Sequence, residues 1–104
     1  MYIVVFVTTK DEEEANTIAQ KLLQEKLIAC ANIINNIKSI FSWQGKIDRA
    51  DEALLILKSQ QKFFSKLVKA VKSVHSYDVP EIIALPIMEG SEDYLNWIKT
   101  ETQI

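Results

Sequence analysis

The sequence predicts an α+β fold in one domain, and three observations support this. Residues 2–9 are a run of β-branched and aromatic side chains, which is typical of a strand that is buried or central in its sheet. Apolar side chains then recur at helical spacing from Ala15 to Leu23, and the two periods alternate along the rest of the chain. Only two glycines and two prolines occur among the 104 residues, so we expect one domain over residues 1–104 with no linker.

The first strand, Tyr2 to Thr9, leads into the first helix through a capping-box pattern. Thr9 is the expected N-cap, with Glu12 three residues further on. The acidic residues 11–14 fall in the first turn, where negative charge favours the helix dipole. We therefore interpret them as structural rather than as a metal or acid-base cluster.

The later elements follow from the same periodicities. They are a strand from about Ala29 to Trp43, a hairpin at Gly45, a strand from Lys46 to Lys58, an amphipathic helix around Phe63 to Val71, a strand from Glu81 to Met88, and a short helix capped by Ser91. The order βαββαβα gives two βαβ halves, which form a ferredoxin-like, split-βαβ sandwich with helices on one face of an antiparallel sheet. The second and fourth strands then lie at the edges, and Pro86 fits an edge because it cannot donate to a ladder.

The second strand is too long for the domain. Residues 31–43 would span about 43 Å when fully extended, whereas a domain of this size has a diameter of only ~33 Å. We expect the hairpin to overhang or bend, and the pair Asn35-Asn36 to supply a bulge or kink because asparagine tolerates positive φ.

Beyond that pair the hairpin is apolar on both sides. Ile37, Phe41 and Trp43 alternate onto one face, and Ile40 lies on the other. An exposed strand of this kind is prone to aggregate unless another chain covers it. The sequence therefore predicts an oligomer.

Charge and composition exclude several classes of protein. Fourteen acidic and twelve basic residues give a net charge of -2 and a pI of about 5.4, which argues against a nucleic-acid binder. The one basic concentration has helical spacing and indicates either an ordinary solvated face or, as the alternative, an anion site; it consists of Lys62, Lys66, Lys69 and Lys72.

The N-terminal apolar run is far shorter than the ~20 residues that span a bilayer, so we expect no membrane segment. The single cysteine, Cys30, cannot form an intramolecular disulfide and is expected to be a small buried hydrophobic residue. Together these features favour the reducing cytoplasm.

No catalytic residues are expected. The chain has one histidine, and it contains no Gly-rich phosphate loop, no paired histidines and no CxxC pattern. The remaining candidate for chemistry is the segment His75 to Glu81, which lies between a helix and a strand. One interpretation is a structural helix terminus in which Tyr77 seals the core and Pro80 fixes the strand entry. The other is a polar site, since an imidazole, a phenol and carboxylates can bind a metal or small ligand.

Three segments and one pair in the last helix carry a family resemblance. They are Ala29-Cys30-Ala31-Asn32, the hairpin Ser39 to Lys46, the H-x-Y-x-x-P-E motif from His75 to Glu81, and Tyr94-Leu95 with Trp97. Together they resemble the CutA divalent-cation tolerance proteins over essentially the whole chain. The resemblance implies a ferredoxin-like fold, a homotrimer whose long hairpins pair with neighbouring subunits, and a cytoplasmic protein linked to the response to metal ions, copper especially.

The resemblance also implies two kinds of site. In some CutA proteins copper is held by a cysteine and two adjacent histidines, but Val7 and Val74 stand at the cysteine and first-histidine positions. His75 remains as the metal ligand, so we expect weak binding of Cu²⁺, with no required cofactor and no catalysis. The alternative is a regulatory module similar to the PII signalling proteins, which would bind a small molecule or protein partner in a cleft between subunits. The residues expected to line that cleft are Trp43, Lys58, His75, Tyr77 and Glu81.

Overall fold

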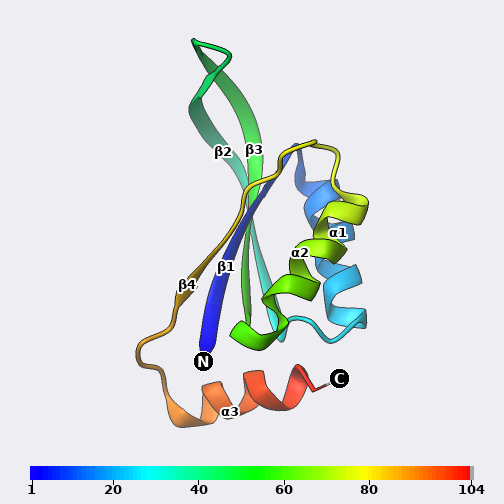
Figure 1. The fold of residues 1–104 in the computed structure, drawn as a ribbon, viewed down its shortest axis with the longest axis vertical. Helices are drawn as coiled ribbons and strands as arrows, with labels where there is room; N and C mark the ends of the chain where they lie inside the picture. The colour runs from blue at the N-terminus through cyan, green and yellow to red at the C-terminus, as the bar shows by residue number, and fades with distance from the viewer. Residues whose placement is uncertain (104) are drawn as a thin grey trace.

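A computed structural model gives the fold of the chain and describes residues 1–103 (Figure 1). Its elements are β1 (Tyr2–Thr9), α1 (Glu12–Gln24), β2 (Cys30–Trp43), β3 (Lys46–Gln60), a 3-10 turn η1 (Gln61–Phe63), α2 (Phe64–Val74), β4 (Ile82–Pro86) and α3 (Glu92–Glu101). The predicted order βαββαβα is confirmed. In residues 1–103 no helix is long and apolar enough to cross a membrane.

The four strands form one antiparallel sheet in the order β2-β3-β1-β4. β1 is central, and β2 and β4 lie at the edges, as the sequence predicted. Pro86 pairs with Ile3 at the end of β4, where its missing N–H disturbs no inner ladder. The expected ferredoxin-like α+β architecture is therefore the observed one. β4 ends at Pro86, two residues before the predicted Met88, and β3 continues past Lys58 to Gln60.

One face of the sheet is covered by α1 and α2 and holds the core (Figure 1). Burial alternates along β1, so that every second side chain is buried. Large, fully buried side chains of the core come from both layers: Val5, Val7, Leu55 and Leu57 from the strands, Ile18 and Leu22 from α1, Ile28 from the segment before β2, and Leu67 and Val71 from α2. Burying each such side chain stabilises the fold by roughly 1.5–3 kcal/mol.

The opposite face of the sheet is apolar but largely open. Ile34, Ile83 and Leu85 point to this face and remain between 45% and 50% exposed. α3 crosses it only at the end where β1 begins, where Gln60 Nε2 donates to Thr102 Oγ1 over 2.8 Å (Figure 1). We call this surface the open sheet face.

The β2-β3 hairpin projects beyond the rest of the domain and stretches it to 44 × 26 × 22 Å (Figure 1). The predicted bulge is confirmed: the register shifts between Ile34 and Ile37, and Asn36 has φ 59°. Two residues of β2 oppose one of β3 there, which bends the hairpin. The tip is a two-residue turn in which Gln44 and Gly45 both have positive φ, the geometry that matches the twist of the strands.

The N-cap of α1 differs from the prediction. Asp11, not Thr9, is the cap, because Glu14 N donates to Asp11 Oδ1 over 2.8 Å. Thr9 is still in β1, and its hydroxyl donates to the Asp11 carbonyl over 2.7 Å. β1 ends at Thr9 as predicted, but the helix begins two residues later than the capping box implied, and Glu14 accepts the N–H of Lys10 beside the Asp11 cap.

Candidate functional site

His75 ends α2, and both nitrogens of its ring are engaged by backbone. Nε2 lies 2.8 Å from the carbonyl oxygen of Thr8 at the end of β1, and Nδ1 accepts the N–H of Tyr77 at 3.0 Å. A carbonyl only accepts and a peptide N–H only donates, so this pattern requires the neutral imidazole with its proton on Nε2. The ring therefore joins the helix end, its own loop and the central strand.

This arrangement bears directly on metal binding. A metal needs a free nitrogen lone pair, and at His75 the one on Nδ1 is shared with Tyr77 N–H. Among residues 1–103 no group of three or more histidine, cysteine, aspartate or glutamate side chains could hold a metal ion. Within a single chain the residues do not fit a closed metal centre, and a metal at His75 would have to displace a hydrogen bond.

Tyr77 reaches across to β3. Its hydroxyl donates to Glu52 Oε2 over 2.8 Å, and its ring centroid lies 4.9 Å from that of His75. Burial and the nearby Glu52 carboxylate together raise the pKa of Tyr77 to about 12. Glu52 therefore accepts a hydrogen bond from the loop. The raised pKa also means that the phenol of Tyr77 stays protonated at neutral pH.

Glu14 of α1 fixes the loop from the other side. Its Oε2 accepts the N–H of Ser76 at 2.8 Å, while Oε1 accepts the N–H of Lys10 at 3.1 Å. Partial burial alone would raise the pKa of Glu14, but the hydrogen bonds from Lys10 and Ser76 outweigh burial and lower it. We use the term latch for the contacts of His75, Ser76 and Tyr77 with Thr8, Glu14 and Glu52.

Sequence reasoning missed the partners of the latch. Glu14 was interpreted only as a helix-dipole residue, and Ser76 lies 62 positions away from it. Glu52 lies in a strand that was recognised only by its apolar residues. The spacing of the motif carries no signal for these contacts, because they depend on how α1, β3 and the loop meet in space.

The structure brings together only part of the predicted cleft. Glu81 directly precedes β4, whose Ile82 pairs with Val7, so it lies at the same end of the sheet as His75 and Tyr77. Trp43 lies at the hairpin tip, 55% exposed. Lys58 pairs with Cys30 at the far end of β3, and its ammonium group contacts Asn32. Twelve strand residues, or about 40 Å, separate its position from the tip, so a cleft with all five residues needs more than one chain.

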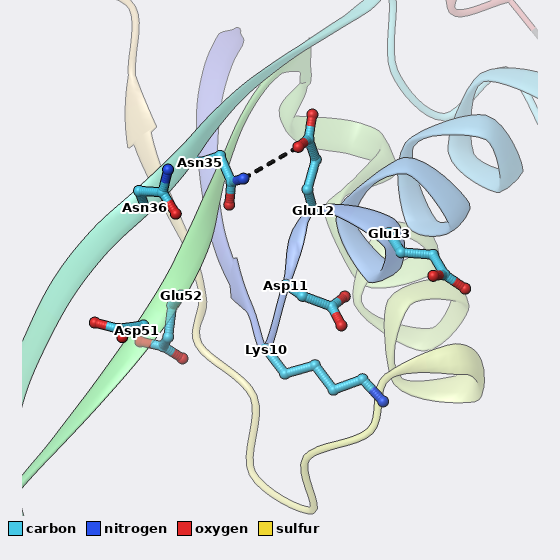
Figure 2. Close-up of a pocket in the computed structure, with 8 residues that line it drawn as sticks. All are labelled: Lys10, Asp11, Glu12, Glu13, Asn35, Asn36, Asp51 and Glu52. Carbon is cyan, nitrogen blue, oxygen red and sulfur yellow. Dashed lines mark hydrogen bonds between the residues drawn. The ribbon is translucent and has the colours of Figure 1, made fainter.

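A hollow of about 440 Å³ lies next to the latch, where the β-bulge faces the start of α1 (Figure 2). It is lined by Lys10, Asp11, Glu12, Glu13, Asn35, Asn36, Asp51 and Glu52. Figure 2 shows Glu12 reaching from α1 toward β2, where the Asn35 amide donates to its carboxylate over 3.1 Å. This bond holds the bent hairpin against the helix, and Glu52 is shared with the latch.

Cys30 is not the buried residue that the sequence predicted. It is only partly buried, on the open sheet face, and its sulfur lies 3.9 Å from Asn32 Oδ1. Partial burial, together with the neighbouring Cys30, raises the pKa of Tyr94 in α3. The edge position of β2 explains the difference, since a strand lies on one side of Cys30 only and its neighbour across the open sheet face is Tyr94 of α3.

The sheet order, the projecting hairpin and the latch define a small ferredoxin-like protein in which a polar loop is hydrogen-bonded to α1, β1 and β3. A family described as "CutA1 divalent ion tolerance protein" matches residues 3–101. The divalent-cation tolerance protein CutA of Thermus thermophilus is 46% identical over 99 residues, which cover 95% of this chain and 96% of that one. The chain belongs to the CutA1 family.

Solved structures agree closely. The Cut A1 structure from T. thermophilus superposes with a TM-score of 0.97 and covers 99% of this chain and 100% of that one. A structure described as the periplasmic divalent cation tolerance protein CutA of Archaeoglobus fulgidus gives a TM-score of 0.96 at 41% identity, covering 99% and 100% of the two chains. The chloroplastic CutA protein of Arabidopsis thaliana is 46% identical over 101 residues, which are 97% of this chain but 56% of that protein. The chain thus spans little more than half of some relatives and nearly all of others.

Proposed function

We propose that this protein is a non-catalytic homotrimer that acts in the tolerance of, or response to, divalent cations, copper included, and that it binds metal only weakly, through His75. Membership of the family supports the role in divalent-cation tolerance. The observation that supports weak metal binding and the absence of catalysis is the engagement of both His75 nitrogens. It gives a metal no ready ligand, and it also leaves neither nitrogen free to act as a general base.

Weak binding follows from the same geometry. A metal at Nδ1 must replace the hydrogen bond from Tyr77 N–H, which contributes about 1 kcal/mol in a typical case. One imidazole is also far fewer ligands than copper takes in a closed site. Any further ligand would have to come from Asp78, Glu81 or another subunit.

The open sheet face and the hairpin support the trimer. Both surfaces expose large apolar side chains, among them Phe41, Trp43 and Ile83. An edge strand that is this long and apolar is normally covered by pairing with another chain. Three copies would cover the open faces and bring each hairpin against a neighbour, with Trp43 near another subunit's latch.

Calorimetric titration with Cu(II) tests the metal assignment. We expect a shallow isotherm for the wild type and a flatter one for His75→Ala. Tyr77→Phe is the matched control, since it alters the loop but keeps the imidazole. Identical isotherms for the wild type and His75→Ala would remove His75 as a ligand. Light scattering of the wild type tests the assembly separately, and a stable monomer at micromolar concentration would contradict the trimer.

A second function is favoured by the latch itself, which closes a polar loop beside the end of β1. In this proposal the trimer is a regulatory module, and a small ligand or a protein partner binds between subunits among Trp43, Lys58, His75, Tyr77 and Glu81. Native mass spectrometry of the trimer with candidate metabolites tests it. A metabolite that stays bound to the wild-type trimer but not to Trp43→Ala would support the cleft. No bound metabolite on the wild type would count against it.

We place the protein in the cytoplasm because its single thiol suits a reducing compartment. Relatives with names that say chloroplastic or periplasmic show that the same fold serves elsewhere. Fractionation of cells that express the natural gene would decide the compartment.

A further inference from the structure

The segment that forms η1 and α2 carries a basic surface. Residues 61–74 contain four lysines and no acidic residue, in a chain whose net charge is -2. We call this surface the lysine face, and it consists of the exposed side chains Lys62, Lys66, Lys69 and Lys72. The sequence left open whether these lysines form a solvated face or an anion site.

Most of this charge is uncompensated. Within residues 1–103 the ion pairs join Lys21 to Glu25 and Lys38 to Asp51, each at 2.7 Å, and neither includes the lysine face. Lys62 makes a cation–π contact, since its ammonium group lies 5.2 Å from the Phe63 ring centroid. Like charges three or four residues apart on a helix repel one another. A docked anion would relieve that repulsion.

Beside the lysine face lies an apolar hollow of about 450 Å³, between the end of α1 and α2. Leu27 and Ala70 form its buried floor, and Lys66, Lys69 and Ser73 line its α2 side. Glu25 closes the opposite rim but is already paired with Lys21. The hollow can take an apolar side chain while the two lysines hold carboxylates next to it.

We propose that the lysine face and this hollow dock an acidic peptide segment of a partner protein, with one apolar side chain in the hollow and carboxylates on Lys66 and Lys69. Charge complementarity selects an acidic partner. The apolar floor is recessed, so no side chain here can insert into a lipid surface. The chain as a whole is acidic and offers no aromatic side chain in the hollow for base stacking, which disfavours nucleic acid.

This docking surface does not depend on the trimer. α1 and α2 lie on the side of the sheet opposite the open sheet face (Figure 1). If the open faces join, the lysine face remains outward, and three copies would bind a multivalent partner more tightly than one copy does.

The test is fluorescence anisotropy at low salt with a labelled twelve-residue probe of glutamate and aspartate around one central leucine. We expect the full-length wild type to bind it and Lys66→Gln/Lys69→Gln to bind at least about threefold more weakly, since each exposed ion pair contributes modestly. Lys46→Gln/Lys99→Gln is the matched control, because it removes the same charge elsewhere, and we expect less than a twofold change. Replacing the leucine of the probe by glycine should weaken binding to the wild type.

Three results would overturn the proposal. They are no binding of the probe, equal weakening by the two double variants, and tighter binding of single-stranded DNA or phosphatidylserine vesicles through Lys66 and Lys69. Light scattering on the same variants tests the trimer separately from the docking surface. A variant that no longer binds the probe but keeps the mass of the wild-type assembly has lost only the function of the lysine face.

Discussion

Replacing Tyr77 by phenylalanine removes one oxygen atom and isolates one contact of the latch. That oxygen donates to Glu52 Oε2 over 2.8 Å. Glu52 is 8% exposed, and in residues 1–103 its carboxylate has no other hydrogen-bond donor. A buried acceptor that loses its donor costs about 1–3 kcal/mol. We therefore expect Tyr77→Phe to lower the free energy of unfolding by that amount at neutral pH.

Urea unfolding followed by circular dichroism measures this loss, at one fixed protein concentration because assembly would make stability concentration-dependent. Tyr2→Phe is the control, since no hydrogen bond of the Tyr2 hydroxyl occurs within residues 1–103, and we expect almost no change. Glu52→Gln combined with Tyr77→Phe closes a double-mutant cycle that isolates the pair.

The pH dependence gives a second, independent check. The pKa of Tyr77 is raised from 10.0 to about 12 in the folded protein, so the protonated phenol is the form that stabilises the fold. This contribution is fully present below pH 10 and is lost as pH rises toward 12. The difference between the wild type and Tyr77→Phe should therefore shrink over that interval. A Tyr77→Phe variant as stable as the wild type, with the same alkaline profile, would refute the reasoning.

Three further predictions concern the fold around the site. Asn36→Val should cost about 1–2 kcal/mol, because a β-branched residue is strained at φ 59°, and Asn36→Gly in the same thermal scan should cost less. Glu14 has a lowered pKa, so its stabilisation is present above pH 4.5 and lost as pH falls through the folded value; Glu14→Gln should be less stable at pH 7 and flatter in an acid titration. Leu55→Ala should cost about 2–5 kcal/mol in urea, because Leu55 is fully buried in the core.

The elements that sequence reasoning placed correctly are those that local rules determine. β1 was recognisable because its apolar run is continuous, and the bulge because asparagine is one of the few residues that tolerates φ 59°. The N-cap of α1 was misplaced because Thr9 and Asp11 both suit a cap, and the choice between them depends on pairing with β3, which continues to Thr9. The sequence around Thr9 and Asp11 does not show how far β1 pairs with β3, so it could not decide which of the two residues caps the helix.

The site was predictable only in part for the same reason. The motif from His75 to Glu81 marked the right loop, since the only histidine and a proline before a strand are visible in the sequence. Its partners Glu14 and Glu52 come from α1 and β3, so they depend on the packing of three elements. The predicted cleft depends on a further step, because about 40 Å of strand separates the level of Lys58 from the hairpin tip.

A metal at His75 would compete with the latch for one atom, the Nδ1 nitrogen. Tyr77 N–H and any metal at Nδ1 of His75 need the same lone pair, so each metal bound there loosens the link between the loop and α2. Two other contacts of the loop, from Ser76 to Glu14 and from Tyr77 to Glu52, do not involve the imidazole. If a metal binds to Nδ1, we therefore expect the loop to shift without unfolding. In a trimer, the loop and its neighbour's hairpin would move relative to each other, so a weak site could still produce a structural response to divalent cations.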